Sequence, residues 1–339
     1  MWQQQVNLQR YNTLNIAARA AYLSEIDSLQ SLRDVLIAKQ QQLPDLPLLV
    51  IGGGSNLVFK QDFPGLVLVN GIKGIEVIRE SASHITLKVG AGENWDQFVA
   101  FTLQQGWYGL ENLSAIPGTV GAAPIQNIGA YGVELSAFLV AVDVLDVQSL
   151  VSSEISAADC QLGYRDSVFK RELKNQKVIC SVTLTLNKQP NLKLDYADIP
   201  QRMAALAMDA QSITPMQLRQ LITAIRSEKL PDPKILPNAG SFFKNPVVSA
   251  EHFAQLKQRF PDIVAFEVEQ GVKLAAGWLI DQLGWKGKCQ GQAQVHERQA
   301  LVLVNHGDRG ADLIALAEAI QADVHQHYGV ELEPEPNII

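Results

Sequence analysis

Apolar residues recur at helical spacing in several parts of the chain. Between Asp27 and Gln40 they fall at Leu29, Leu32, Val35 and Leu36, which lie on one face of an α-helix. Asn94 is a good N-cap for a second helix that runs to Gln105, and Gly106 can end it. The same spacing predicts helices from Thr214 up to the proline-containing segment 229–234, and over 249–260, 273–283 and 311–328.

Short apolar or alternating runs predict strands between these helices. The alternation is clearest over 177–186, where Val178, Cys180, Val182, Leu184 and Leu186 are expected to share one face. The other predicted strands are 46–51, 66–69, 74–79, 84–89, 139–147 and 300–305, and 238–246 is predicted to be a loop. Helices and strands do not alternate regularly, so the pattern favours an α+β fold over a repeated βαβ unit.

The length of 339 residues exceeds what one core usually serves, so we expect two or three domains, with the main boundary near the prolines after the helix that begins at Thr214. No apolar run is long enough to span a bilayer, and the polar N-terminus does not resemble a signal peptide. The net charge of −7 argues against nucleic acid as a partner, but a small anion held by local cations is compatible with it. Cys160, Cys180 and Cys289 form neither a metal spacing nor a disulfide framework, which favours a reducing cytoplasm.

Two segments are unusually rich in glycine. The first glycine-rich loop, Ile51–Asn56, follows a predicted strand, and the second glycine-rich loop, Ser114–Glu134, contains Gly118, Gly121, Gly129 and Gly132 with almost no charge. Glycine allows positive φ and close approach of the backbone, and successive N–H groups in such conformations bind anions. Both segments are explained either as tight turns or as the cradle of a dinucleotide pyrophosphate.

Common catalytic motifs are absent from the sequence. The first glycine-rich loop lacks the Rossmann spacing, and no HExxH, GxSxG, Walker or CxxC pattern occurs. His296 stands alone before a strand, and we interpret it as a structural or surface histidine, so neither metal catalysis nor triad hydrolysis has support. Three polar stretches lack an evident structural need, although each is also compatible with a solvated turn: 163–167, 238–246 and 332–335.

Six motifs in order resemble the UDP-N-acetylenolpyruvoylglucosamine reductase family. They are Ile51–Asn56, 116–132, Gly163–Ser167, Lys229–Lys234, Gly240–Pro246 and Leu332–Glu335. The resemblance extends from Asn12 to Glu335 and includes the longer subtype's substrate-covering tyrosine, matched by Tyr196 in 194–197. Leu14 stands where the family has phenylalanine, and the chain ends soon after the glutamate motif.

This resemblance implies a fold and a reaction. The fold would be α+β, with a two-part FAD-binding domain of the vanillyl-alcohol-oxidase/p-cresol-methylhydroxylase type over residues 1–70 and 71–224, and an α+β substrate-binding domain over 225–339. NADPH would reduce non-covalently bound FAD, which would reduce UDP-N-acetylglucosamine enolpyruvate to UDP-N-acetylmuramate, a step of peptidoglycan synthesis that supports cell shape and cell division. The enzyme would be cytoplasmic, without membrane or metal, and we expect a monomer.

The resemblance also implies residue roles. Arg165 and Glu335 would stabilise an enolate, because cations and hydrogen-bond donors placed at developing charge supply much of an enzyme's acceleration. Ser241 would protonate that enolate, helped by Lys244. Substrate binding would involve Tyr164, Tyr196, Arg226, Lys229, Asn245 and Gln299. Cofactor binding would involve Gly52, Gly53, Gly54, Ser55, Asn56, Pro117, Gly118, Gly121, Ala122, Ile125, Gln126, Asn127, Gly129, Ala130, Tyr131 and Gly132.

Two other functions remain open at this point. One is a different flavoenzyme of the same fold, such as an oxidase acting on an alcohol or a sugar. The other is a nucleotide-binding protein without catalytic activity, which would be colourless when purified.

Overall fold

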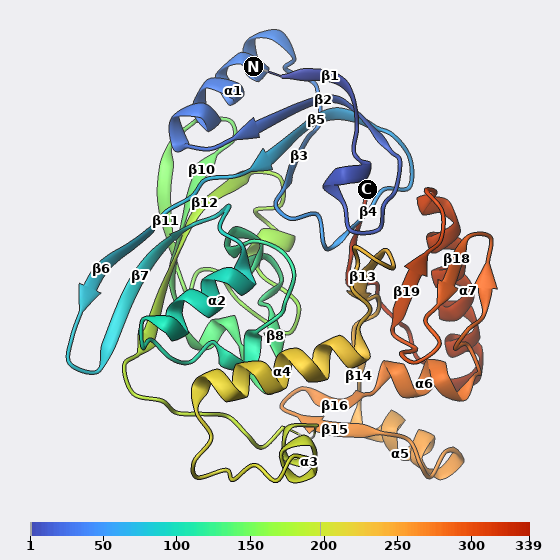
Figure 1. Ribbon diagram of the computed structural model, residues 1–339. Helices are drawn as coiled ribbons and strands as arrows, with labels where there is room; N and C mark the ends of the chain where they lie inside the picture. Colours follow the sequence, from blue (N-terminus) through green and yellow to red (C-terminus); the bar gives the residue numbers. More distant parts are fainter. Residues whose placement is uncertain (1, 197) are drawn as a thin grey trace. The chain divides into compact units, whose positions relative to one another are not determined.

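The computed structural model describes residues 2–196 and 198–339, and the chain divides into two compact units (Figure 1). Unit 1 comprises 1–6, 20–53 and 64–228, and unit 2 comprises 7–19, 54–63 and 229–339. The last crossing between units lies four residues beyond the predicted boundary at 224/225. The predicted first subdomain, 1–70, is interrupted twice, because 7–19 and 54–63 make their contacts within unit 2. Met1 and Ala197, the latter the end of the motif around Tyr196, lie outside the described residues.

The first layer of unit 1 is a four-stranded sheet covered by α1 (Leu29–Gln42). Ser28 caps this helix, since its side chain accepts a hydrogen bond from Ser31 N. Leu32, Val35 and Leu36 are buried in one core with residues of the sheet, as their spacing predicted. In sheet order the strands are β1 (Gln3–Asn7), β2 (Arg19–Ile26), β5 (Phe63–Asn70) and β3 (Leu48–Ile51), with β3 and β5 parallel.

The second layer of unit 1 is a five-stranded sheet that carries α2 (Trp95–Gln104) on one face (Figure 1). Asn94 caps α2 as predicted, accepting from Gln97 N at 3.0 Å. Trp95, Phe98 and Val99 of this helix pack in the largest core of the unit. In sheet order the strands are β11 (Ser152–Ser156), β10 (Leu139–Asp146), β12 (Lys177–Asn187), β7 (His84–Gly90) and β6 (Ile75–Glu80), with antiparallel pairing throughout.

The central strand β12 departs from the predicted alternation. Its pairing with β10 shifts register at Cys180, since Asp143 faces Ser181 but Val144 faces Ile179. A bulge of this kind reverses the faces of the residues beyond it. Val178 and Cys180 therefore pack in the core under α1, whereas Val182, Leu184 and Leu186 pack in the core under α2. The prediction that all five share one face is wrong.

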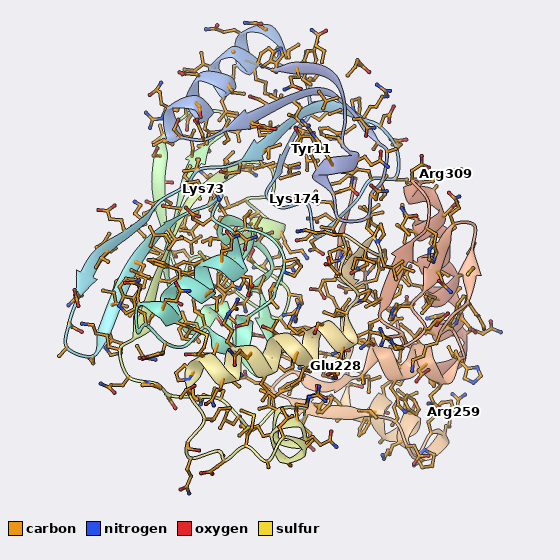
Figure 2. All side chains as sticks on the ribbon, in the orientation of Figure 1. Tyr11, Lys73, Lys174, Glu228, Arg259 and Arg309 are labelled. Atoms are coloured by element: carbon orange, nitrogen blue, oxygen red, sulfur yellow. The ribbon has the colours of Figure 1, made fainter. Side chains whose placement is uncertain are left out.

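The last elements of unit 1 are two helices with a small core of their own, α3 (Asp198–Ala205) and α4 (Pro215–Lys229). Tyr131 of the second glycine-rich loop packs against this core, so the loop and α4 are neighbours. Figure 2 labels Glu228 near the end of α4, where the chain leaves unit 1. Two short strands within the loop pair with each other, β8 (Gly129–Ala130) and β9 (Val133–Glu134).

Unit 2 contains two small sheets and a strand pair. The segment that includes Tyr11 (Figure 2) belongs to unit 2 because Thr13 bonds to it at both backbone groups. Thr13 N donates to Gly54 O, and Thr13 O accepts from Asn238 N. Asn305 Nδ2 also donates to Leu14 O at 2.8 Å. The strands are β13 (Asn238–Ser241), β19 (Val302–Asn305), β18 (Ala293–Val295) and β17 (Cys289–Gln290) in one sheet, β14 (Val247–Val248), β16 (Gly271–Leu274) and β15 (Ala265–Val268) in the other, and β4 (Leu57–Val58) with β20 (Asn337–Ile338).

Two predictions for unit 2 need correction. The helix predicted over 273–283 begins at Ala276, because Lys273 and Leu274 are held in β16 by pairing with β14 and β15. The predicted loop 238–246 begins with β13, which pairs with β19. The helices of the unit are α5 (Ala250–Arg259), α6 (Ala276–Gln282) and α7 (Gly310–Tyr328). Among the described residues no helix is both long and apolar enough to cross a membrane.

Candidate functional site

The two glycine-rich loops lie against each other in unit 1. A Cβ added to Gly53 would lie 3.1 Å from Gly118 Cα, and one added to Gly52 would overlap the Thr119 hydroxyl. The glycines therefore let two backbones approach at a distance that other residues would prevent. The first glycine-rich loop also crosses between units, because Gly54, Ser55 and Asn56 belong to unit 2.

The second glycine-rich loop is fixed to the segment that leads into α2. Val120 N donates to Glu93 O, and Gly121 N donates to Ala91 O, both at 2.8 Å. A side chain at Gly121 would overlap Ala91, so this part of the loop also depends on glycine. The loop then forms two short 3₁₀ turns, Val120–Ala122 and Pro124–Gln126, which contain the predicted cofactor residues Ala122, Ile125 and Gln126.

Asn127 holds the middle of this loop. It is almost fully buried and has a φ of 42°. Its Oδ1 accepts from Ser136 N at 3.0 Å, and its Nδ2 donates to Glu134 Oε2 at 2.8 Å and to Gly163 O at 3.1 Å. The structure gives this predicted cofactor residue a role in shaping the loop, and direct contact with a cofactor stays a prediction.

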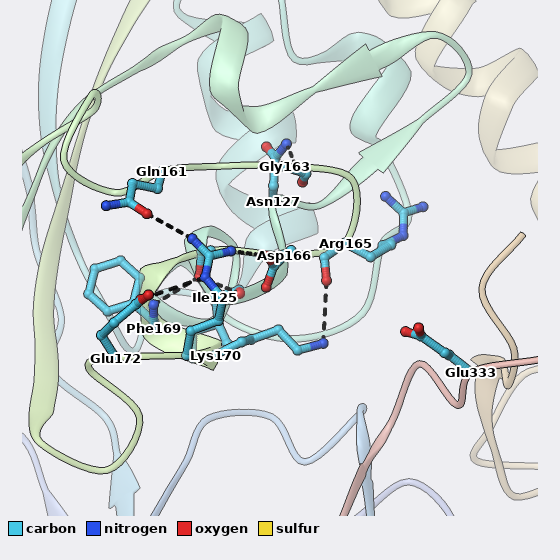
Figure 3. A network of polar contacts seen from close by, with 12 residues as sticks. Ile125, Asn127, Gln161, Gly163, Arg165, Asp166, Phe169, Lys170, Glu172 and Glu333 are labelled. Atoms are coloured by element: carbon cyan, nitrogen blue, oxygen red, sulfur yellow. Dashed lines mark hydrogen bonds and ion pairs between the residues drawn. The ribbon is translucent and has the colours of Figure 1, made fainter. Parts of the chain in front are cut away.

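The turn Gly163–Ser167 brings Arg165 to the same loop (Figure 3). Arg165 Nη2 donates to Gly129 O at 2.8 Å, and Ser167 Oγ donates to Ile125 O at 2.6 Å. Arg165 itself has a φ of 53°, and its guanidinium lies 5.3 Å from the centre of the Tyr164 ring. Thus the predicted catalytic arginine and a predicted substrate residue are placed together beside the second glycine-rich loop.

Tyr196 contacts the far end of that loop, and Arg226 contacts its start as well as its far end. The Tyr196 ring meets the Tyr131 ring edge to face, with centroids 5.7 Å apart, and contacts the position of Gly132. Arg226 Nε donates to Ala115 O at 3.2 Å, and its charged side chain interacts electrostatically with Tyr131. Burial lowers the pKa of Arg226, opposed by the nearby Tyr131 and Asp96. Burial likewise raises the pKa of Tyr131.

Unit 2 brings Ser241 and Glu335 together. Ser241 ends β13, next to Gly240 with a φ of 73°, and pairs with Val302 of β19. The C-terminal segment runs along the residues that follow Ser241, because Glu335 N donates to Phe242 O at 2.8 Å and Lys244 N donates to Glu333 O at 2.9 Å. The backbone of Glu335 is thus hydrogen-bonded to that of Phe242, the residue that follows Ser241.

Four other residues named in the sequence analysis lie in unit 2 and make local contacts there. Asn56 Nδ2 donates to Glu335 O at 3.3 Å, which links the first glycine-rich loop to the C-terminus. Asn245 Oδ1 accepts from Ala276 N at 3.0 Å and so satisfies the first turn of α6. Lys244 Nζ pairs with Glu333 Oε2 at 2.7 Å. Gln299 Oε1 accepts from Leu301 N, two residues along, at 3.4 Å.

Of the two alternatives for His296, a structural or a surface histidine, the structure excludes the second. It is buried, and its Nδ1 accepts a hydrogen bond from Arg298 N at 3.3 Å. Burial and the charge of Arg298 lower its pKa.

The sequence did not reveal two residues that support the second glycine-rich loop, Asp96 and Arg219. Asp96 accepts from Ala115 N at 2.5 Å and from Arg219 at 2.6 and 2.9 Å. An acidic residue in the first turn of a helix is common because it interacts favourably with the helix dipole, so Asp96 did not stand out in the sequence. The spacing of seven between Arg219 and Arg226 is a usable signal, since it places both on one face of α4.

The residues of the two loops fit a dinucleotide cofactor. The loops provide closely packed backbone with little side-chain bulk and no acidic group between residues 114 and 133. Such backbone accommodates a pyrophosphate, whose negative charge is satisfied by N–H groups. Gly52, Gly53, Pro117, Gly118 and Thr119 would hold that part of the cofactor.

The comparisons with known proteins agree with this assignment. Residues 22–151 match the family model described as FAD binding domain, and residues 232–339 match the model described as UDP-N-acetylenolpyruvoylglucosamine reductase, C-terminal domain. The class is therefore that of the FAD-dependent oxidoreductases.

Named relatives and a solved structure narrow the class. The chain is 50% identical over 331 residues to a UDP-N-acetylenolpyruvoylglucosamine reductase of Burkholderia cenocepacia, covering 97% of this chain and 94% of that protein. It is 49% identical over 329 residues to the enzyme of that name in Alcanivorax borkumensis, covering 97% and 93%. The chain belongs to the UDP-N-acetylenolpyruvoylglucosamine reductase family. The crystal structure of the Thermus caldophilus enzyme shares the fold, with a TM-score of 0.69 at 22% identity, covering 100% of this chain and 99% of that one.

Proposed function

We propose that the chain reduces UDP-N-acetylglucosamine enolpyruvate to UDP-N-acetylmuramate at the expense of NADPH. The observation that carries this proposal is identity of about half the residues with named reductases across 97% of the chain. The placement of Arg165 on the second glycine-rich loop and of Ser241 beside Glu335 supports it. The chemistry that FAD supplies when bound is transfer of a hydride from NADPH to the vinyl carbon of the substrate.

Arg165 is proposed to hold the carboxylate of the enolpyruvyl group. An enol ether is electron-rich and accepts a hydride only if its conjugated carboxylate takes up the electrons. A guanidinium forms two parallel hydrogen bonds to a carboxylate, so it stabilises the enolate that develops. The bond from Nη2 to Gly129 O orients this guanidinium before substrate arrives.

Ser241 is proposed to give a proton to the carbon next to that carboxylate. A hydroxyl is a weak acid, but an enolate is basic enough to take its proton. The Lys244 charge, two residues beyond Phe242, would help to offset the alkoxide that remains. Glu335 is proposed to donate a hydrogen bond to the substrate carboxylate, or to orient Arg165.

The remaining residues are proposed to bind the sugar nucleotide. Tyr196, Lys229 and Asn245 would contact the UDP diphosphate, with Tyr164, Arg226 and Gln299 in supporting positions. The side chain of Tyr196 is accessible to a ligand, since 46% of the residue is exposed. The proposal places the flavin domain within residues 1–224 and the substrate domain in 225–339, with a monomeric enzyme that acts in the cytoplasm in cell-wall synthesis.

The purified protein provides a direct test. It should be yellow, and NADPH should bleach the flavin absorption under anaerobic conditions. Addition of UDP-N-acetylglucosamine enolpyruvate should restore the absorption and yield UDP-N-acetylmuramate. A colourless protein that takes up no FAD would contradict the proposal, as would a reduced flavin that oxygen reoxidises while the enolpyruvyl substrate does not.

A further inference from the structure

Charged side chains from two helices form hydrogen bonds with the backbone N–H and C=O of one residue, Ala115. Its N–H donates to Asp96 Oδ1 on α2 at 2.5 Å, and its C=O accepts from Arg226 Nε on α4 at 3.2 Å. The Asp96 carboxylate also accepts hydrogen bonds from Nη1 and Nη2 of Arg219, at 2.6 and 2.9 Å. Two charged groups therefore fix the Ala115 peptide, and a third fixes Asp96.

Ala115 needs such support because of its backbone conformation. Its φ is 57°, in the left-handed region where a Cβ clashes with the following carbonyl oxygen. It stands two residues before Pro117 and three before Gly118, which packs on the first glycine-rich loop. A change of φ at Ala115 would redirect the chain just before it reaches Gly118.

The α4 arginines connect the beginning and the end of the loop. Arg219 and Arg226 lie two helical turns apart on the same face of α4. Arg219 fixes Asp96, while Arg226 contacts Ala115 O at the start of the loop and Tyr131 near its end. Side chains of α4 and Tyr131 also share a small apolar core.

We propose that Asp96 is a positioning residue for cofactor binding: its pair with Arg219 and its bond to Ala115 N hold Ala115 left-handed and thereby preform the second glycine-rich loop. This inference rests on the proposed function, because it concerns the FAD site of that enzyme. The Asp96–Arg219 pair is more than a solvated surface ion pair, since the Arg219 side chain is only 15% exposed and the geometry is bidentate.

The test compares Asp96→Asn with a matched control, Glu228→Gln. Both changes neutralise an acid that pairs with an arginine, but Glu228 of α4 pairs with Arg202 of α3 and not with a residue that contacts the loop. Apoprotein is titrated with FAD and binding is followed by flavin fluorescence. Asp96→Asn should weaken FAD binding at least tenfold, while Glu228→Gln should change it less than twofold. Equal affinity of Asp96→Asn and wild type would overturn the inference.

A second substitution separates positioning from general stability. In Asp96→Asn, the further change Ala115→Gly should recover at least threefold in FAD affinity, because glycine adopts positive φ without a clash. Thermal unfolding of the apoproteins is measured in parallel. Absence of recovery, or recovery that only follows a rise in the apoprotein melting temperature, would overturn the inference.

If Asp96→Asn does not fold, Arg219→Lys is measured in its place, since it keeps the positive charge and removes the bidentate geometry. It should weaken FAD binding at least threefold, and unchanged affinity would overturn the inference. A wild-type apoprotein that binds no FAD would contradict the proposed function itself.

Discussion

Residues with side chains adopt positive φ at four places in or beside the second glycine-rich loop. These are Ala115, Asn127, Tyr131 and Arg165. Each such conformation costs on the order of 1–3 kcal/mol and persists only where surrounding contacts hold it. Asp96 accepts a hydrogen bond from Ala115 N, and Asn127 accepts one from Ser136 N. The Arg165 guanidinium donates to Gly129 O. This concentration of strained backbone agrees with the loop being the functional part of unit 1.

Removal of the Ser241 hydroxyl should separate the two halves of the reaction. In Ser241→Ala, reduction of the flavin by NADPH should keep its rate, because the hydroxyl takes no part in that step. Turnover of the reduced enzyme with substrate should slow by about 10²–10⁴-fold, the usual contribution of a positioned acid. Anaerobic stopped-flow measurements follow both steps by flavin absorption.

Ser227→Ala is the control for this experiment. Ser227 is exposed on α4, and its hydroxyl donates to Ala224 O within the same helix, so both rates should stay at the wild-type value. Equal slowing of the two half-reactions in Ser241→Ala would contradict the assigned role.

A buried carboxyl group should make stability depend on pH. Glu111 is 2% exposed, and burial raises its pKa, opposed by hydrogen bonds that include Gly109 N. The folded protein thus binds this proton more tightly than the unfolded chain, so stability falls as pH rises through the unfolded pKa toward the folded one. Glu111→Gln cannot ionise and keeps an oxygen for Gly109 N. Its melting temperature relative to wild type should be higher at pH 8 than at pH 4. An equal difference at both values would contradict this explanation.

At the scale of elements, Gly54 shows why one loop position excludes a side chain. Gly54 has a φ of 65°, and an added Cβ would overlap the Tyr11 carbonyl. Gly284 has a φ of 68° and open space around it. Gly284→Ala should cost only the left-handed conformation, about 1–2 kcal/mol, while Gly54→Ala should cost more because the backbone must move. Urea unfolding of both variants measures the difference, and equal losses would show that the overlap relaxes without cost.

The elements that the sequence predicted well are those with a strong local signal. Helix α2 begins where Asn94 can cap it, and α7 ends before Gly329, whose φ is 67°. Predictions failed where pairing between strands decided the outcome, as at β12, β13 and the start of α6. Strand pairing depends on partners far away in the sequence, and local periodicity does not contain this information.

At the scale of the whole molecule, the chain passes between its two units several times. Residues 7–19 and 54–63 belong to unit 2, although the rest of the first 228 residues belongs to unit 1. The predicted boundary near residue 225 did not include these two excursions of the chain into unit 2. Their position follows from contacts such as Thr13 with Asn238, Leu14 with Asn305 and Asn56 with Glu335.

The sequence alone determined the α+β class, the two glycine-rich loops and the family, because these depend on residue types in a fixed order. It also identified Arg165, Ser241 and Glu335 as candidates. Only the tertiary structure joined Glu335 to Phe242, the residue after Ser241, bonded Arg165 to Gly129 and linked Arg219 through Asp96 to Ala115. Those contacts join residues up to 123 positions apart, and hydrogen-bond geometry between such distant residues is fixed only when the chain has folded.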